Sequence, residues 1–148
     1  MTKTSMWRTL TVCVVLAFGS SLTAQSTNQR EGSKRCSNRT LSGDYGTQIE
    51  GTILGPNLPL RTISMAHFDG VENVTSRDHV VLNGVSAEEW REANWSYKVN
   101  PDCTGTWEVF TGPGNQPIKV YFVVVKHGTE IHGVVDGGAI VINAYKVE

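Results

Sequence analysis

The sequence has no basic run, and after its first two dozen residues it has no long apolar run. Its 13 Lys and Arg residues and 14 Asp and Glu residues are scattered along the chain. A basic patch is typical of proteins that bind nucleic acid or anionic membranes, so these partners are disfavoured. No segment reaches the roughly 20 apolar residues that a transmembrane helix needs, so we expect no membrane span.

Motifs of known catalytic and metal sites are also missing. The chain has no glycine-rich phosphate loop, no nucleophile elbow and no histidine pair at the spacing of zinc hydrolases. His67, His79, His127 and His132 show no metal-ligand spacing, and a zinc site needs more ligands than two cysteines. We therefore expect no metal and no cofactor, and a binding role is favoured over an enzymatic one.

The N-terminus has the order of an export signal. Lys3 and Arg8 precede an apolar run at residues 10–18, and small residues follow up to Ala24. The run is too short to cross a bilayer about 30 Å thick. We expect residues 1–24 to be a signal peptide and the protein to be secreted or periplasmic.

Processing would leave one domain. Without residues 1–24 the chain keeps 11 basic and 14 acidic residues, and its length suits a single modest core. Val12 precedes Cys13, where a lipoprotein signal has a small residue, so no lipid anchor is expected. Residues 25–35 are polar without apolar periodicity and predict a flexible leader, followed by a folded domain at 36–148.

Cysteine is scarce, and two cysteines remain in the expected mature chain. Cys36 and Cys103 form an even pair in an exported protein, which indicates a disulfide. Closing so long a loop would contribute about 4 kcal/mol in the chain-entropy model. The alternative is two free buried thiols.

From Cys36 onward the chain consists of short runs with period-two alternation, separated by turn signals such as Asn83-Gly84. No stretch has a convincing helical pattern, although residues 86–92 predict one helical turn or a charged loop. The expected strands are 45–53, 60–68, 73–82, 93–99, 103–109, 118–126, 130–135 and 139–147.

This pattern predicts an all-β fold. About eight strands with short connections form an antiparallel up-and-down meander, whose exposed edges disappear when it closes into a barrel. A two-sheet β-sandwich is the alternative.

Several aromatic residues fall on the expected inward face. Trp95 and Tyr97 alternate with polar residues on one strand, and Trp107 does so on the next. With Tyr45 and Phe122 they are the candidate ligand-contacting residues. If all five point inward, they could also fill the barrel by themselves.

The runs at residues 118–125 and 139–145 are apolar on both faces. A barrel strand of this kind needs a cover over its outer face. The leader, the 86–92 segment or another subunit could supply it. We favour a subunit contact, which makes the protein a homo-oligomer.

Polar residues on the strands give weaker indications. Glu50 and Glu108 lie opposite the inward faces of their strands and are expected in solvent. For His132 a surface or hydrogen-bonded position is favoured over a general base. His67 and Asp69 are placed near a barrel rim, where ligand contacts often occur.

Three motifs carry a resemblance that covers nearly the whole domain: "CSNRTLSGDYG" (36–46), "MAHFDGVENVT" (65–75) and "YKVNPDCTGTW" (97–107). The chain resembles a group of small exported bacterial proteins of unknown function that share these motifs. The resemblance implies a closed barrel similar to lipocalins or allene oxide cyclases, with both motif cysteines bridged. It implies no activity and transfers no catalytic residues.

Three functions remain open. The leading hypothesis is non-catalytic binding of a small apolar molecule, because an eight-stranded barrel has room for about one such ligand. The second is a structural or surface-interaction module with a filled barrel. The third is a cyclase or isomerase similar to allene oxide cyclases, which would fold a reactive apolar substrate against the aromatic lining.

Overall fold

The computed structural model describes residues 35–87, 89–109 and 116–148. The expected signal peptide, and all but the last residue of the expected leader, lie outside the described residues. The described chain consists mainly of strands, with two short 3-10 turns, η1 (Asn38–Thr40) and η2 (Lys126–Gly128). The strands are β1 (Ser42–Ile53), β2 (Leu58–Asp69), β3 (Asn73–Leu82), β4 (Val85–Ser86), β5 (Arg91–Val99), β6 (Thr104–Val109), β7 (Ile118–Val125), β8 (Glu130–Val135) and β9 (Ala139–Lys146).

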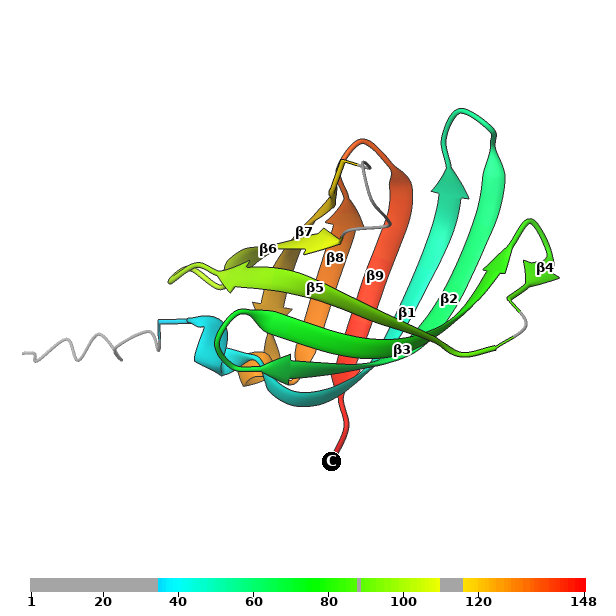
Figure 1. The fold of residues 1–148 in the computed structure, drawn as a ribbon. Helices are drawn as coiled ribbons and strands as arrows, with labels where there is room; N and C mark the ends of the chain where they lie inside the picture. Colours follow the sequence, from blue (N-terminus) through cyan, green and yellow to red (C-terminus); the bar gives the residue numbers. More distant parts are fainter. Residues whose placement is uncertain (1–34, 88, 110–115) are drawn as a thin grey trace, which may run out of the picture. The chain divides into compact units, whose positions relative to one another are not determined.

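Eight of the strands close into an antiparallel barrel (Figure 1). Each pairs with the next along the chain, β3 pairs with β5, and β9 returns to β1 with Tyr45 opposite Lys146. The predicted up-and-down barrel is confirmed, because pairing of the first and last strands excludes the sandwich. The short strand β4 extends β3 outside the barrel circuit.

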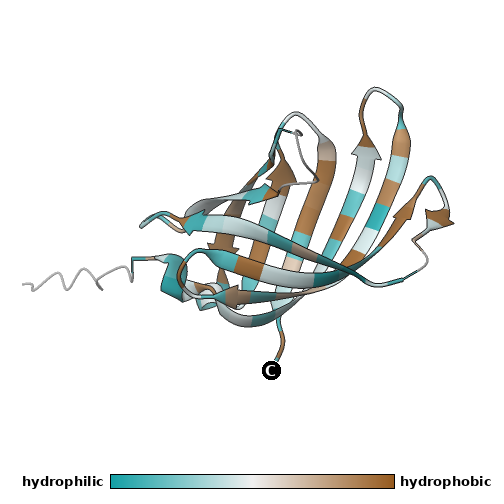
Figure 2. Cartoon of the chain, in the orientation of Figure 1, coloured by the Kyte–Doolittle hydropathy of each residue, from teal (hydrophilic) through white to brown (hydrophobic). Residues whose placement is uncertain are grey.

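Side chains alternate between the lumen and the outer surface. On β2 the residues Thr62, Ser64, Ala66 and Phe68 are buried while their neighbours are exposed. Figure 2 shows bands of different hydropathy along β1 and β2, but on β2 the buried Thr62 and Ser64 are polar, whereas Ile63 and Met65 are apolar and exposed. The period of two is what a strand requires when one face meets a core and the other meets water.

Aromatic rings fill one end of the lumen. Tyr45 and Phe68 are almost completely buried, with ring centroids 5.0 Å apart in an edge-to-face arrangement. Tyr97 and Trp107 contact the same phenylalanine at 5.1 and 6.0 Å. Leu41, directly after η1, is also fully buried, so the segment before β1 covers this end. We call it the closed end.

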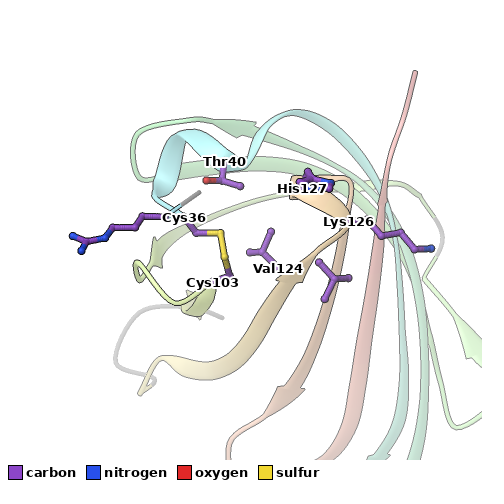
Figure 3. Close-up of a pocket in the computed structure, with 9 residues that line it drawn as sticks. Cys36, Thr40, Cys103, Val124, Lys126 and His127 are labelled. Carbon is purple, nitrogen blue, oxygen red and sulfur yellow. A yellow bond between two sulfur atoms is a disulfide. The ribbon is translucent and has the colours of Figure 1, made fainter. Parts of the chain in front are cut away.

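The predicted disulfide is present at the closed end (Figure 3). Cys36 precedes η1, and Cys103 lies in the turn between β5 and β6; their Cα atoms are 5.0 Å apart. The Cys36 amide also donates to the Pro101 carbonyl at 3.2 Å. The bridge therefore ties the covering segment to the barrel.

The 86–92 segment forms no helical turn in its described part. Ser86 ends β4 and Arg91 begins β5. Trp90 is 46% exposed, and its ring lies 5.8 Å from His79. Of the two predictions for this segment, the charged loop is the one that the structure supports.

Candidate functional site

The end of the lumen opposite the aromatic rings contains a hollow of about 550 Å³, which we call the mouth hollow. Its wall includes the aliphatic side chains of Ile49, Leu60, Val109, Val120, Val135 and Ile142. Lys119 and Asp136 supply charge at its border. Cavities of this size and composition are typical of sites that bind one small apolar molecule.

The hollow exists because aromatic side chains lie at one end of the barrel axis and aliphatic side chains lie at the other. The aromatic inward residues of β1, β2 and β5 pack at the closed end. Towards the mouth the inward positions of β1 and β7–β9 are mainly aliphatic, as in the continuation of β1 through Ile49 and of β9 through Ile140 and Ile142. Shorter side chains leave space in a barrel of this strand number.

The five aromatic residues predicted to contact a ligand all point inward, but none of them lines the mouth hollow. Tyr45, Tyr97, Trp107 and Phe122 are at most 3% exposed. Trp95 and Trp107 are the cross-strand neighbours of the hollow's Val109 and Val120, so the two indoles lie next to its inner end. Their ligand role stays a prediction.

The two buried tyrosines are hydrogen-bonded to the backbone at the closed end. The Tyr45 hydroxyl donates to the Gly128 carbonyl, and burial raises the pKa of Tyr45. The Tyr97 hydroxyl lies 3.1 Å from the carbonyls of Asn38 and Leu41. Burial, helped by the charge of Asp69, raises the pKa of Tyr97 to about 12. Both phenols are therefore neutral hydrogen-bond donors at physiological pH.

One wall of the lumen is polar. Thr47, Ser64, Asp78 and Arg91 are consecutive cross-strand partners on β1, β2, β3 and β5. The same alternation that buries Ala66 on β2 and Ser76 on β3 places this row inward. Asp78 accepts two hydrogen bonds from Arg91, one from Nε at 3.2 Å and one from Nη2 at 3.0 Å. The sequence reasoning missed this pair, although the alternation from Val74 and Trp95 marks both residues as inward-facing.

Two buried hydroxyls near this ion pair, those of Ser64 and Ser76, have no hydrogen-bond partner among the described residues. Ser64 is the cross-strand partner of Asp78, and Ser76 lies two residues before Asp78 on β3. Each unpaired buried group costs about 1–3 kcal/mol, so the wall has unused capacity to bind a polar ligand group.

His67 and Asp69 have structural roles at the closed end. The Asp69 carboxylate accepts from the amides of Val71, Glu72 and Asn73 at 2.7–3.0 Å. Partial desolvation acts to raise the pKa of Asp69, but these hydrogen bonds and one from the Asn73 side chain lower it to about 2. His67 Nδ1 lies 2.7 Å from Asp44 on the outer surface. Both residues thus lie away from the mouth hollow.

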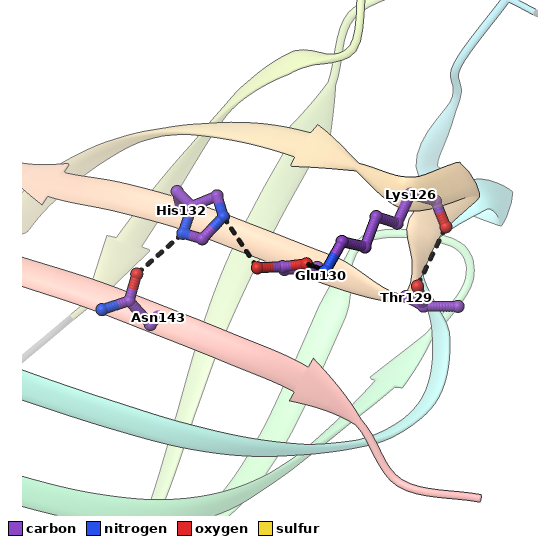
Figure 4. Close-up of polar contacts among 5 residues, drawn as sticks. All are labelled: Lys126, Thr129, Glu130, His132 and Asn143. Carbon is purple, nitrogen blue, oxygen red and sulfur yellow. Dashed lines mark hydrogen bonds and ion pairs between the residues drawn. The ribbon is translucent and has the colours of Figure 1, made fainter.

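His132 belongs to a polar cluster on the outer face of β8 (Figure 4). Its Nδ1 lies 2.7 Å from Asn143 Oδ1, and its Nε2 lies 3.0 Å from Glu130 Oε1. The hydrogen bond from Lys126 is the main cause that lowers the pKa of Glu130. Because both ring nitrogens of His132 are engaged, the cluster leaves no free nitrogen for a general base. Glu50 likewise lies on the outer face, 3.4 Å from Arg61.

The outer face of β7–β9 is apolar, as the sequence predicted. Tyr121, Val123, Val134 and Val141 are 43–52% exposed, and no described segment covers them. They border a shallow hollow of about 650 Å³, whose polar edge includes Thr104 and Asn143. We call these four residues the outer patch.

A third hollow, of about 530 Å³, lies beside the disulfide (Figure 3). Cys36, Thr40, Val124 and His127 contribute to its wall. Lys126 borders it too, but its ammonium pairs with Glu130. Arg35, Thr40 and His127 are its other polar lining residues.

Comparison with protein-family models, with curated proteins and with solved structures finds no match to the chain. Within the described residues, no group of three His, Cys, Asp or Glu side chains is placed to hold a metal ion. The same part of the chain contains no helix with the length and hydrophobicity needed to cross a membrane.

Proposed function

We propose that this protein is an exported, non-catalytic binding barrel that takes up a small, mostly apolar molecule in the mouth hollow. The observation that carries the proposal is the 550 Å³ volume with an aliphatic wall at one end of a lumen whose other end is filled. Burying an apolar ligand there releases about 25 cal/mol for each Å² of apolar surface removed from water. The disulfide is compatible with an oxidising compartment, which supports the proposed export.

The distribution of titratable groups favours binding over catalysis. Among the described residues, the groups with shifted pKa values are Tyr45, Asp69, Tyr97, Asp102, Lys126 and Glu130. None of these six lines the mouth hollow. General acids and bases are commonly tuned by such shifts, and the shifted groups of the described residues lie away from the hollow.

Filling the mouth hollow tests the proposal. Naphthalene serves as the apolar probe, and isothermal titration calorimetry measures its Kd. We expect the protein to bind naphthalene and Val135→Phe to weaken binding about tenfold or more, because the ring occupies ligand space. Ile63→Phe is the matched control: its side chain is 55% exposed on the outer face of β2, away from the outer patch, so binding should not change. Failure of the wild type to bind, or unchanged binding by V135F, would contradict the proposal.

A second candidate function, a surface-interaction module, is supported by the outer patch. Its apolar centre with a border of Thr104, Asn143 and His132 has the composition of a protein interface core with a polar rim. We favour a second copy of the chain as the partner that binds the outer patch. Because the barrel is closed, its strands have no free edges in the circuit, and association would occur through side chains.

A cyclase or isomerase similar to allene oxide cyclases is the third candidate. Such an enzyme would bind its substrate against the aromatic and aliphatic lining and need little acid-base machinery. Trp95 and Trp107, next to the inner end of the mouth hollow, are the residues that favour it. Conversion of a bound apolar epoxide to an isomer of the same mass, followed by nuclear magnetic resonance of the extracted ligand, distinguishes this function from binding alone.

A further inference from the structure

The lumen has two chemically different halves. In the barrel circuit, β3 lies opposite β8 and β5 lies opposite β9. The β8–β9 half presents Val135, Ile140 and Ile142 to the mouth hollow. The β3–β5 half presents the ion pair of Asp78 and Arg91, with Ser64 beside it on β2. None of the residues of this polar row lines the mouth hollow, so a molecule in the hollow must extend across the lumen to reach the polar wall.

The ion pair does not use all the hydrogen-bonding capacity of Arg91. Its guanidinium has five N–H donors, and Asp78 engages two of the nitrogens. The Arg91 side chain is 55% exposed, whereas that of Asp78 is 16% exposed, so the free donors of Arg91 are accessible. The Ser64 hydroxyl, on a residue 7% exposed next to the pair, has no hydrogen-bond partner among the described residues.

The charge of the wall limits the ligand class. Asp78 already balances the positive charge of Arg91, so an added carboxylate would be repelled by the Asp78 carboxylate nearby. An uncharged oxygen accepts a hydrogen bond from Arg91 without that repulsion. A hydroxyl group can in addition donate to Asp78 or to the unpartnered Ser64 oxygen.

We propose that the polar row on β1, β2, β3 and β5 selects apolar molecules that carry one uncharged hydroxyl or carbonyl group. The oxygen binds Arg91 and Ser64, and the apolar body lies in the mouth hollow against β8 and β9. This inference rests on the proposed binding function and names the ligand class for the same lumen.

The test compares three ligands that share one skeleton: 2-naphthol, naphthalene and 2-naphthoate. Isothermal titration calorimetry gives the Kd of each at neutral pH. We expect 2-naphthol to bind about tenfold more tightly than naphthalene, because it gains one hydrogen bond to a charged group. We expect 2-naphthoate to bind no better than naphthalene. Tighter binding of 2-naphthoate than of 2-naphthol would overturn the inference, because the wall would then select an anion.

Substitutions in the polar row test whether it causes the preference for 2-naphthol over naphthalene. Arg91→Gln should remove most of the tenfold preference for 2-naphthol while naphthalene binding stays. Ser64→Ala removes one buried hydroxyl and should also reduce the preference. This variant provides the test if R91Q does not fold. Arg61→Gln is the matched control, since Arg61 pairs with Glu50 on the outer face. It should keep the full preference.

The outcomes separate the two proposals. The inference is overturned if R91Q and S64A both keep the preference for 2-naphthol, or if S64A keeps it when R91Q is unfolded. The proposed binding function is unaffected by that result. Absence of binding for naphthalene and 2-naphthol alike overturns the binding function, and the inference with it. Loss of the preference in R61Q would also contradict the inference, because an outer-face change should not reach the lumen.

Discussion

Tyr97 shows how burial and hydrogen bonding act on a single residue. Its side chain is 3% exposed, and its hydroxyl lies between the carbonyls of Asn38 and Leu41 from the covering segment. The pKa rises from 10.0 to about 12, chiefly through burial. Folding therefore holds a proton on Tyr97 that the unfolded chain releases at lower pH.

This shift predicts a pH dependence of stability. Below pH 10 the phenol is protonated in both states, so Tyr97 adds no slope. Between pH 10 and about 12 the unfolded state binds fewer protons than the folded state, and the free energy of unfolding falls as pH rises. Urea titrations across this range should show a smaller fall for Tyr97→Phe than for the wild type. Identical pH profiles for the two proteins would show that Tyr97 does not contribute.

Strands β6 and β7 pack closely because a glycine faces a ring. Gly105 is the cross-strand partner of Phe122, and its backbone lies under that ring. A Cβ added at Gly105 would be 2.2 Å from Phe122 Cζ and 2.5 Å from the Lys98 carbonyl oxygen. The second atom belongs to the backbone, so the contact cannot be relieved by turning a side chain.

Gly105→Ala is accordingly expected to destabilise the barrel by about 1–3 kcal/mol, the usual cost of overpacking. Urea unfolding measures the change. Gly46→Ala is the control: it also lies within a strand, but its added Cβ would have its nearest neighbour, the Tyr145 carbonyl oxygen, at 4.0 Å. A change of less than about 0.5 kcal/mol is expected there. Equal effects of the two substitutions would show that the contact at Phe122 is not rigid.

Closure of the barrel decides how the whole molecule can associate. Every strand of the circuit has a partner on both sides, so its backbone groups are satisfied within the chain. The outer patch on β7–β9 is left as an exposed apolar surface. Association of two copies through this patch would bury it without breaking any strand pairing.

We expect light scattering after size-exclusion chromatography to show a dimer that Val141→Arg converts to a monomer. A guanidinium placed in the outer patch would lose solvation in the interface without gaining a partner. Ile63→Arg is the control, since Ile63 is 55% exposed on the outer face of β2, away from the patch. It should leave the dimer intact. A wild-type protein that is monomeric at all concentrations would contradict the interface.

Local pattern was sufficient for the strands and their faces. The run from Tyr45 to Ile53 alternates because its inward side chains meet the lumen, and the observed strand β1 adds only Ser42, Gly43 and Asp44. Strand count and short connections were enough to favour a barrel. The two-residue strand β4 was missed, since so short a strand forms only where β3 offers a partner.

By itself, then, the sequence determined the strand order, the inward faces and the cysteine pair, because period-two alternation and redox chemistry are local or compositional properties. Only the tertiary structure decided the height of each side chain along the barrel axis. Register between strands brought Ser64, Asp78 and Arg91 into one row and placed the aromatic rings at the other end. Alternation tells which face a residue occupies, but the position along the axis depends on pairing between strands distant in the chain.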